Sequence, residues 1–119
     1  MQPDLTDSTK SALKLQTSKR EGELVVQCVG KLTINHAETL KHLVKSMLPL
    51  EKRIILDLNG ITQMDSSGLG ALVSLYVSAK KGNCELILIN YSKPVRDLLG
   101  LTNLLSVFEA SARYGSRLP

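Results

Sequence analysis

The sequence predicts an α/β fold: a single domain built on a mostly parallel β-sheet with one antiparallel edge strand, layered with about four helices. Short apolar runs typical of strands alternate with stretches in which apolar residues recur at helical spacing. Only the polar residues 19–22 separate the first two strand-like runs, so these two strands must pair antiparallel. Each later pair is separated by a helix, as parallel strands require. The 119 residues are the length of one domain.

Residues 1–11 are polar and show no apolar periodicity, so we expect a flexible N-terminal tail followed by one domain over residues 12–119. The first two strands are expected at residues 12–18 and 23–32. Apolar residues make up 43% of the chain, which is enough to bury a core without disulfides or a structural metal.

The next segment is predicted to be an amphipathic helix. Asn35 stands three residues before Glu38, which is the spacing of a capping box, and apolar residues then recur at helical intervals as far as Pro49. A strand at residues 53–58 follows. Asp57 lies near its carboxyl end and alternates with apolar neighbours, so we interpret it as a structural residue.

The second helix is expected over residues 69–81, with Gly82 ending it in a left-handed conformation. Residues 86–89 are a continuous apolar run, which predicts a strand covered on both faces. The sheet therefore gains another parallel strand after this helix.

The last part of the chain is expected to contain a short helix and a final strand. Ser92 followed by Pro94 is typical of a helix start, and the helix is expected to end at Gly100. Residues 105–108 form a short apolar run that predicts one more strand.

Composition argues against several classes of function. The 15 basic residues exceed the 11 acidic ones, but they are dispersed, so we expect no direct nucleic-acid binding. No apolar run approaches the roughly 18 residues that span a bilayer, and no signal peptide is visible, so we expect a cytoplasmic chain without membrane insertion. Cys28 and Cys84 lie far apart in apolar runs and are expected to be buried free thiols. We expect neither a metal nor a cofactor.

The run MDSSGLG, from Met64 to Gly70, is the most informative segment of the sequence. It lies between the strand expected at 53–58 and the helix expected at 69–81, at the edge of a parallel sheet where ligands and partners bind. Asp65 and the following serines suit a helix start, because their oxygens accept from unpaired first-turn N–H groups. The same helix end stabilises added negative charge. The residues alone therefore leave two interpretations open, a structural cap and a site for a phosphate.

Known catalytic motifs do not fit this run. A hydrolase nucleophile lies in Gly-x-Ser-x-Gly, but neither Ser66 nor Ser67 has a glycine two positions before it. A P-loop needs a lysine directly after its last glycine, and none is present. His36 is expected in a first helical turn and His42 at the surface, which leaves no base for a serine. We expect no catalytic residues and no enzymatic activity.

The six-residue segment that begins at Asp65 resembles the signature of the STAS family, the anti-sigma factor antagonists. The resemblance covers roughly residues 12–110 and includes Gly30, the helix start at 37–40 and the segment 94–101. It implies the same α/β fold and a partner-switching function. In such a switch the unmodified protein binds a kinase-like anti-sigma factor, which uses ATP to phosphorylate one serine of the antagonist. A metal-dependent serine phosphatase reverses the modification.

Matched residue by residue, the resemblance implies that Ser66 is the phosphoacceptor. Asp65 is expected to cap the helix, and phosphate beside it is expected to disrupt a desolvated interface. The sequence departs from the family at Thr33, where many members carry an aspartate. The residues implied to bind the partner are Thr33, Asn35, His36, Asp65, Ser67, Gly68, Leu69 and Gly70.

Two other functions stay open at this point. One is a STAS scaffold or transporter-associated subunit that is not phosphorylated, in which Ser66 only caps the helix. The other is a small-molecule or nucleotide sensor that uses the same turn. The scaffold hypothesis expects substitutions at Ser66 to act only through folding stability.

Overall fold

The computed structural model describes residues 13–109. The tail expected at residues 1–11 and both ends of the domain expected over 12–119 lie outside this range. The elements, in chain order, are β1 (Leu13–Arg20), β2 (Glu23–Leu32), α2 (Ala37–Met47), β3 (Arg53–Met64), α3 (Ser66–Lys81), β4 (Glu85–Ile89) and α4 (Lys93–Leu101).

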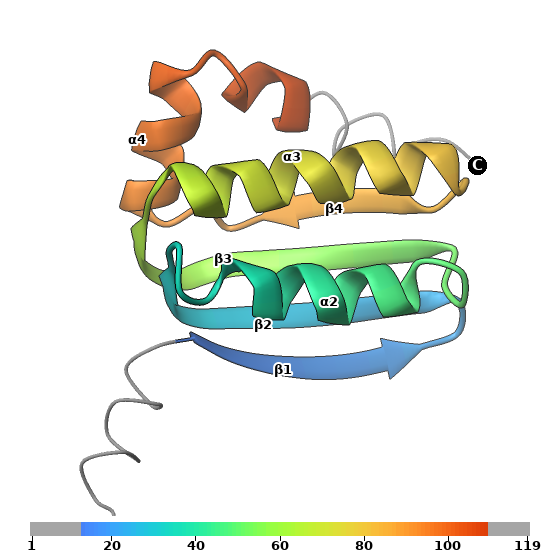
Figure 1. Ribbon diagram of the computed structural model, residues 1–119. Coiled ribbons are helices and arrows are strands. Elements are labelled where there is room, and N and C mark those ends of the chain that lie inside the picture. Colours follow the sequence, from blue (N-terminus) through green and yellow to red (C-terminus); the bar gives the residue numbers. More distant parts are fainter. Residues whose placement is uncertain (1–12, 110–119) are drawn as a thin grey trace, which may run out of the picture.

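The four strands form one sheet in the order β1-β2-β3-β4 (Figure 1). β1 is antiparallel to β2, and the pairs β2–β3 and β3–β4 are parallel. The predicted α/β fold, with its mostly parallel sheet and one antiparallel edge strand, is confirmed. The turn between β1 and β2 consists of Glu21 and Gly22, and Gly22 has a φ of +69°. Glycine adopts this conformation without strain, so two residues suffice for the turn. Because the turn is this short, β1 continues beyond the expected residues 12–18 to Arg20.

Helices α2 and α3 lie along one face of the sheet (Figure 1). Alternate side chains of the central strands point to this face, because successive residues of a strand face opposite sides. The helices contribute one apolar stripe each, so the core between sheet and helices is aliphatic. Its fully buried members include Val26, Cys28, Leu32, Leu40, Val44, Ile54, Leu56, Leu58, Leu72 and Leu75.

Strand β3 is longer than the expected residues 53–58, because it continues to Met64. The Asn-Gly pair after residue 58 is typical of a turn, but here Gly60 continues the strand opposite an irregularity in the β2–β3 register. A Cβ at Gly60 would lie 2.8 Å from Cγ2 of Val29, so this close approach requires glycine. Asp57 therefore lies in the middle of β3, and its expected place near the carboxyl end was wrong.

Helix α3 begins at Ser66, three residues earlier than expected, and ends at Lys81. Gly82 has a φ of −95°, so the prediction that it is left-handed was wrong. The left-handed residue is the next one, Asn83, with a φ of 60°. Asparagine tolerates this conformation better than other non-glycine residues, which explains the shift by one position.

Helix α4 begins after Ser92, as predicted, with Pro94 in its first turn. The Ser92 hydroxyl makes no capping hydrogen bond. The helix does not end at Gly100 but continues to Leu101, and the left-handed residue that follows is Asn103, with a φ of 61°.

Residues 105–109 are helical, so the strand predicted at 105–108 was wrong. The Phe108 N–H donates to the carbonyl of Leu104 over 3.2 Å. The buried Phe108 ring packs edge-on against Tyr76 of α3, with ring centroids 5.4 Å apart. A short apolar run fits either secondary structure, and the contact with α3 favours the helix.

Both cysteines are buried and free, as predicted. Burial, together with the charge of Asp57, raises the pKa of the Cys28 thiol to about 12. Burial also raises the pKa of Cys84, and the negative charges of Glu51 and Glu85 add to this effect. Neither thiol is therefore poised to act as a nucleophile or a metal ligand.

Candidate functional site

The MDSSGLG run forms the turn from β3 into α3. Asp65 is the N-cap residue, and its Oδ1 accepts hydrogen bonds from the N–H groups of Ser67 (2.9 Å) and Gly68 (3.1 Å). The Leu69 N–H donates to the Asp65 carbonyl over 3.0 Å. The prediction that Asp65 caps the helix is confirmed. Ser66 is the first helical residue, is exposed, and is not the cap.

The second carboxylate oxygen of Asp65 connects this turn to the loop between β2 and α2. Asp65 Oδ2 accepts a hydrogen bond from the N–H of Ile34 over 3.0 Å, across 31 residues of sequence. Desolvation alone would raise the pKa of Asp65, but the N–H groups of Gly68, Ile34 and Ser67 outweigh it and lower this pKa below its ordinary value. Asp65 is therefore ionised at neutral pH, and both of its carboxylate oxygens accept backbone hydrogen bonds.

Gly68 allows the start of α3 to approach β2 closely. A Cβ at this position would collide with the Leu32 carbonyl oxygen and would lie 2.9 Å from Cγ of both Leu32 and Met64. A Cβ at Gly70 would meet nothing within 4 Å. Close packing thus explains Gly68 and leaves Gly70 without a structural requirement for glycine.

The capping box expected from Asn35 and Glu38 is not formed. The N-cap residue of α2 is His36, and it makes no side-chain capping hydrogen bond. The Thr33 carbonyl accepts from the N–H groups of both His36 and Ala37, each over 2.8 Å. The helix begins one residue later than an Asn35 cap requires, and His36 precedes the first turn.

The structure brings the predicted site residues together at one end of the sheet, where α2 and α3 both begin (Figure 1). We call residues 33–36 and 65–70, which the hydrogen bond between Asp65 and Ile34 joins, the loop–turn surface. Within it Ile34, Asn35, Ser66 and Gly70 are exposed and Gly68 is buried, while Thr33, His36, Asp65, Ser67 and Leu69 are half-buried.

Ile34 was absent from the residues expected at this surface, although it is 69% exposed. Its contact with Asp65 joins distant parts of the chain, so no local spacing could have revealed it. The only signal was an isoleucine in an otherwise polar loop, and single exposed apolar residues are common on protein surfaces.

The hydrogen bonds of Asp65 limit what its carboxylate can do at the loop–turn surface. Both oxygens of Asp65 accept backbone N–H groups, so this carboxylate is not placed to act as a base for Ser66. The His42 side chain is 85% exposed and lies against Glu38. Across residues 13–109, no group of three or more His, Cys, Asp or Glu side chains could hold a metal ion.

Within residues 13–109, none of the helices is both long enough and apolar enough to cross a bilayer.

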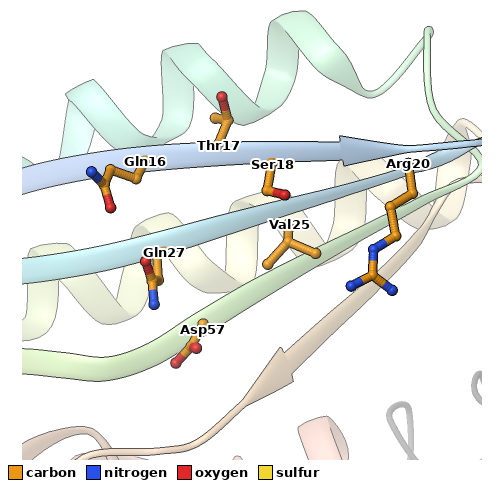
Figure 2. A pocket seen from close by; sticks show the side chains of 7 residues that line it. All are labelled: Gln16, Thr17, Ser18, Arg20, Val25, Gln27 and Asp57. Carbon is orange, nitrogen blue, oxygen red and sulfur yellow. The ribbon is translucent and has the colours of Figure 1, made fainter.

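A second feature, which the sequence did not predict, lies on the sheet face turned away from α2 and α3. Figure 2 shows side chains from β1, β2 and β3 around a shallow hollow of about 480 Å³. Gln16, Gln27 and Asp57 lie in register across the three strands. The lining residues are Gln16, Thr17, Ser18, Arg20, Val25, Gln27 and Asp57, and none of them belongs to the loop–turn surface.

This fold, with an exposed serine after a capping aspartate at the start of α3, defines a small α/β domain. Residues 14–116 match the STAS domain family, and the chain belongs to that family. The resemblance inferred from the sequence is confirmed.

Individual relatives agree with this assignment. A STAS-domain containing protein of Pseudomonas aeruginosa is 29% identical over 89 residues, which are 75% of this chain and 88% of that protein. The anti-sigma-B factor antagonist of Bacillus subtilis is 25% identical over 104 residues, or 85% of this chain and 93% of that one.

The anti-sigma factor antagonist SpoIIAA shares the fold. Its unphosphorylated form matches with a TM-score of 0.68 and 23% identity, covering 89% of this chain and 96% of that one. The phosphorylated form of SpoIIAA from Bacillus matches with a TM-score of 0.64 and 22% identity, covering 82% and 87% of the two chains.

Proposed function

We propose that this protein is an anti-sigma factor antagonist that works by partner switching. In its unmodified form it binds a kinase-like anti-sigma factor through the loop–turn surface. The partner uses its own ATP to phosphorylate Ser66, and the phosphate ends the complex. A metal-dependent serine phosphatase restores the unmodified form. The protein itself is not an enzyme, needs no cofactor, and acts in the cytoplasm without contacting nucleic acid.

The observation that carries this proposal is the position of Ser66. It is exposed at the first position of α3, directly after Asp65, the cap residue whose two carboxylate oxygens both accept backbone hydrogen bonds. A kinase can therefore reach the hydroxyl without unfolding the helix. Relatives support the role, because one is named an anti-sigma-B factor antagonist and SpoIIAA is known in unphosphorylated and phosphorylated forms.

The effect of a phosphate on the fold differs from its effect on a complex. The free N–H groups of the first helical turn were expected to make a phosphate tolerable there, but Asp65 already accepts from those of Ser67 and Gly68. The phosphate on Ser66 therefore remains in solvent, where the helix dipole partly offsets its repulsion from Asp65. It adds about −1.5 to −2 charges, and burying these against a partner built for a hydroxyl is costly. The fold tolerates the modification and the complex does not.

Two substitutions at Ser66 test the proposal. Ser66→Asp places a charge in the interface and should weaken binding to the purified kinase-like anti-sigma factor by a few kcal/mol. Ser66→Ala should bind like the unmodified protein. Both variants should unfold within about 1 kcal/mol of wild type, because Asp65 is the cap. Calorimetric titration and urea unfolding measure the two effects separately.

A matched control is Ser18→Asp, which adds the same charge at an exposed serine of β1 outside the loop–turn surface. Its affinity should equal that of wild type. Unchanged affinity of Ser66→Asp would contradict the switch and favour the scaffold hypothesis. Equal weakening by Ser66→Asp and Ser18→Asp would show that net charge, not the position of Ser66, controls binding.

A further inference from the structure

Ile34 is an apolar side chain presented beside the proposed phosphoacceptor. It is one of six large hydrophobic side chains that are at least 40% exposed within residues 13–109, and it alone lies in the loop–turn surface. Exposure by itself assigns no role, since isolated apolar residues are common at surfaces. Ile34 differs because its backbone is bonded to the residue that caps α3.

The loop around Ile34 is fixed from both sides. The Ile34 N–H donates to Asp65 Oδ2, and the preceding Thr33 carbonyl accepts two N–H groups at the start of α2. The Asp65 N–H is 3.4 Å from the Leu32 carbonyl oxygen, the same atom that a Cβ at Gly68 would strike. The backbone therefore holds the Ile34 side chain in solvent. An ordered apolar side chain loses less entropy on binding than one in a mobile loop.

We propose that Ile34 is the apolar anchor through which the loop–turn surface recognises its partner, and that Asp65 is the residue that positions it. This inference rests on the proposed function, and the partner it describes is the kinase-like anti-sigma factor. The complementary surface is an apolar pocket for Ile34 whose rim is sized to hydrogen-bond the Ser66 hydroxyl. A phosphate on Ser66 would not fit this rim and would bring charge into the desolvated contact.

The variant Asp65→Asn separates the two bonds that Asp65 makes. Asparagine caps helices as well as aspartate, so its oxygen can still accept from Ser67 and Gly68. Its NH₂ group cannot accept from the Ile34 N–H, so only the bond to Ile34 is lost. In the isolated protein, amide hydrogen exchange at Ile34 should become faster by about tenfold or more, with Ser67 and Gly68 unchanged. Unchanged exchange at Ile34 would overturn the positioning role.

Binding to the purified anti-sigma factor tests the anchor. Ile34→Ala should weaken binding by about tenfold or more, and Ile34→Val should restore most of the affinity. Leu50→Ala is the matched control, because Leu50 is 67% exposed but lies between α2 and β3, outside the loop–turn surface. Its affinity should not change. Equal losses in Ile34→Ala and Leu50→Ala would overturn the anchor.

A double substitution distinguishes positioning from direct contact. If Asp65 acts through Ile34, Asp65→Asn should weaken binding in wild type but change it little in the Ile34→Ala background. Equal losses in both backgrounds would show that Asp65 contacts the partner itself, which overturns the positioning role.

If Ile34→Ala binds like wild type while Ser66→Asp does not bind, the anchor is wrong and the proposed function stands. If neither substitution affects binding, the proposed function also fails.

Discussion

Replacing Gly68 with alanine probes the close approach of α3 to β2 on which the loop–turn surface depends. The added Cβ would collide with the Leu32 carbonyl oxygen and press on the side chains of Leu32 and Met64, each 2.9 Å away at Cγ. A flexible side chain could move aside, but a backbone carbonyl inside a strand cannot do so freely. The start of α3 must therefore shift away from β2.

The magnitude follows from three contributions. Overpacking in a tight site costs about 1–3 kcal/mol, and the upper half of this range applies because one obstacle is backbone. Displacing the helix start also weakens the hydrogen bond between Asp65 and Ile34, which is worth about 1 kcal/mol. Alanine returns up to about 1 kcal/mol through its higher helix propensity. The net expectation for Gly68→Ala is a loss of about 2–3 kcal/mol in the free energy of unfolding.

Gly70→Ala is the matched control, because a Cβ at Gly70 meets nothing within 4 Å. It should gain about 0.5–1 kcal/mol from helix propensity. Urea unfolding followed by circular dichroism suits this chain, which has no tryptophan for fluorescence. The two alanine substitutions should therefore change the free energy of unfolding in opposite directions. A Gly68→Ala variant as stable as wild type would refute the packing reasoning.

Three further predictions concern the cap, its charge and the thiols. Asp65→Ala removes the cap and should lower the free energy of unfolding by about 0.5–2 kcal/mol or more. Ser66→Ala should lower it by less than about 0.5 kcal/mol. Urea unfolding of both variants checks which residue is the cap. Folding lowers the pKa of Asp65, so its ionised form stabilises the protein above the unfolded-state pKa near 4. This contribution is lost as the pH falls through the folded-state pKa. The difference in free energy of unfolding between wild type and Asp65→Asn should therefore be constant from about pH 5 to 7 and change below about pH 4. Urea unfolding at these pH values measures it, and a difference that does not vary with pH would contradict the lowered pKa. Cys28 and Cys84 should react slowly with a thiol reagent in native buffer, since burial raises the pKa of both thiols, and fast labelling of Cys84 would show that the segment entering β4 is accessible.

Local patterns in the sequence predicted the elements that local chemistry determines. Asp65 was expected to cap α3 because carboxylates bind first-turn N–H groups, and the structure shows this bond. The antiparallel edge strand followed from a link too short for a crossover. Buried strands such as β4 followed from continuous apolar runs.

Two of the predictions that were wrong concern segments whose structure depends on contacts distant in sequence. The strand expected at residues 53–58 continues through Gly60, because a close approach to Val29 of the neighbouring strand makes Gly60 part of β3. Asn35 is a local case: it had the spacing of a cap, but the Thr33 carbonyl accepts from the N–H groups of His36 and Ala37, and the helix begins one residue later. Phe108 belongs to a helix because of its contact with α3.

Ile34 shows the same limit at the candidate site. Its role depends on a hydrogen bond to a carboxylate 31 residues away, and no spacing rule connects the two positions. The sequence could therefore place the turn from Asp65 to Gly70 at the site, and the family resemblance implied Thr33, Asn35 and His36, but neither identified Ile34 as the residue bonded to Asp65.

The central claim is that Ser66 is the switch, and phosphopeptide mapping tests it most directly. The purified protein is incubated with its kinase-like anti-sigma factor and ATP, then digested and analysed by mass spectrometry, while the complex is followed by size-exclusion chromatography. The account predicts a single phosphate on Ser66 and dissociation of the complex as the phosphate accumulates. A phosphate on Ser67 alone, or a stable complex in which Ser66 stays unmodified by a competent kinase, would contradict it.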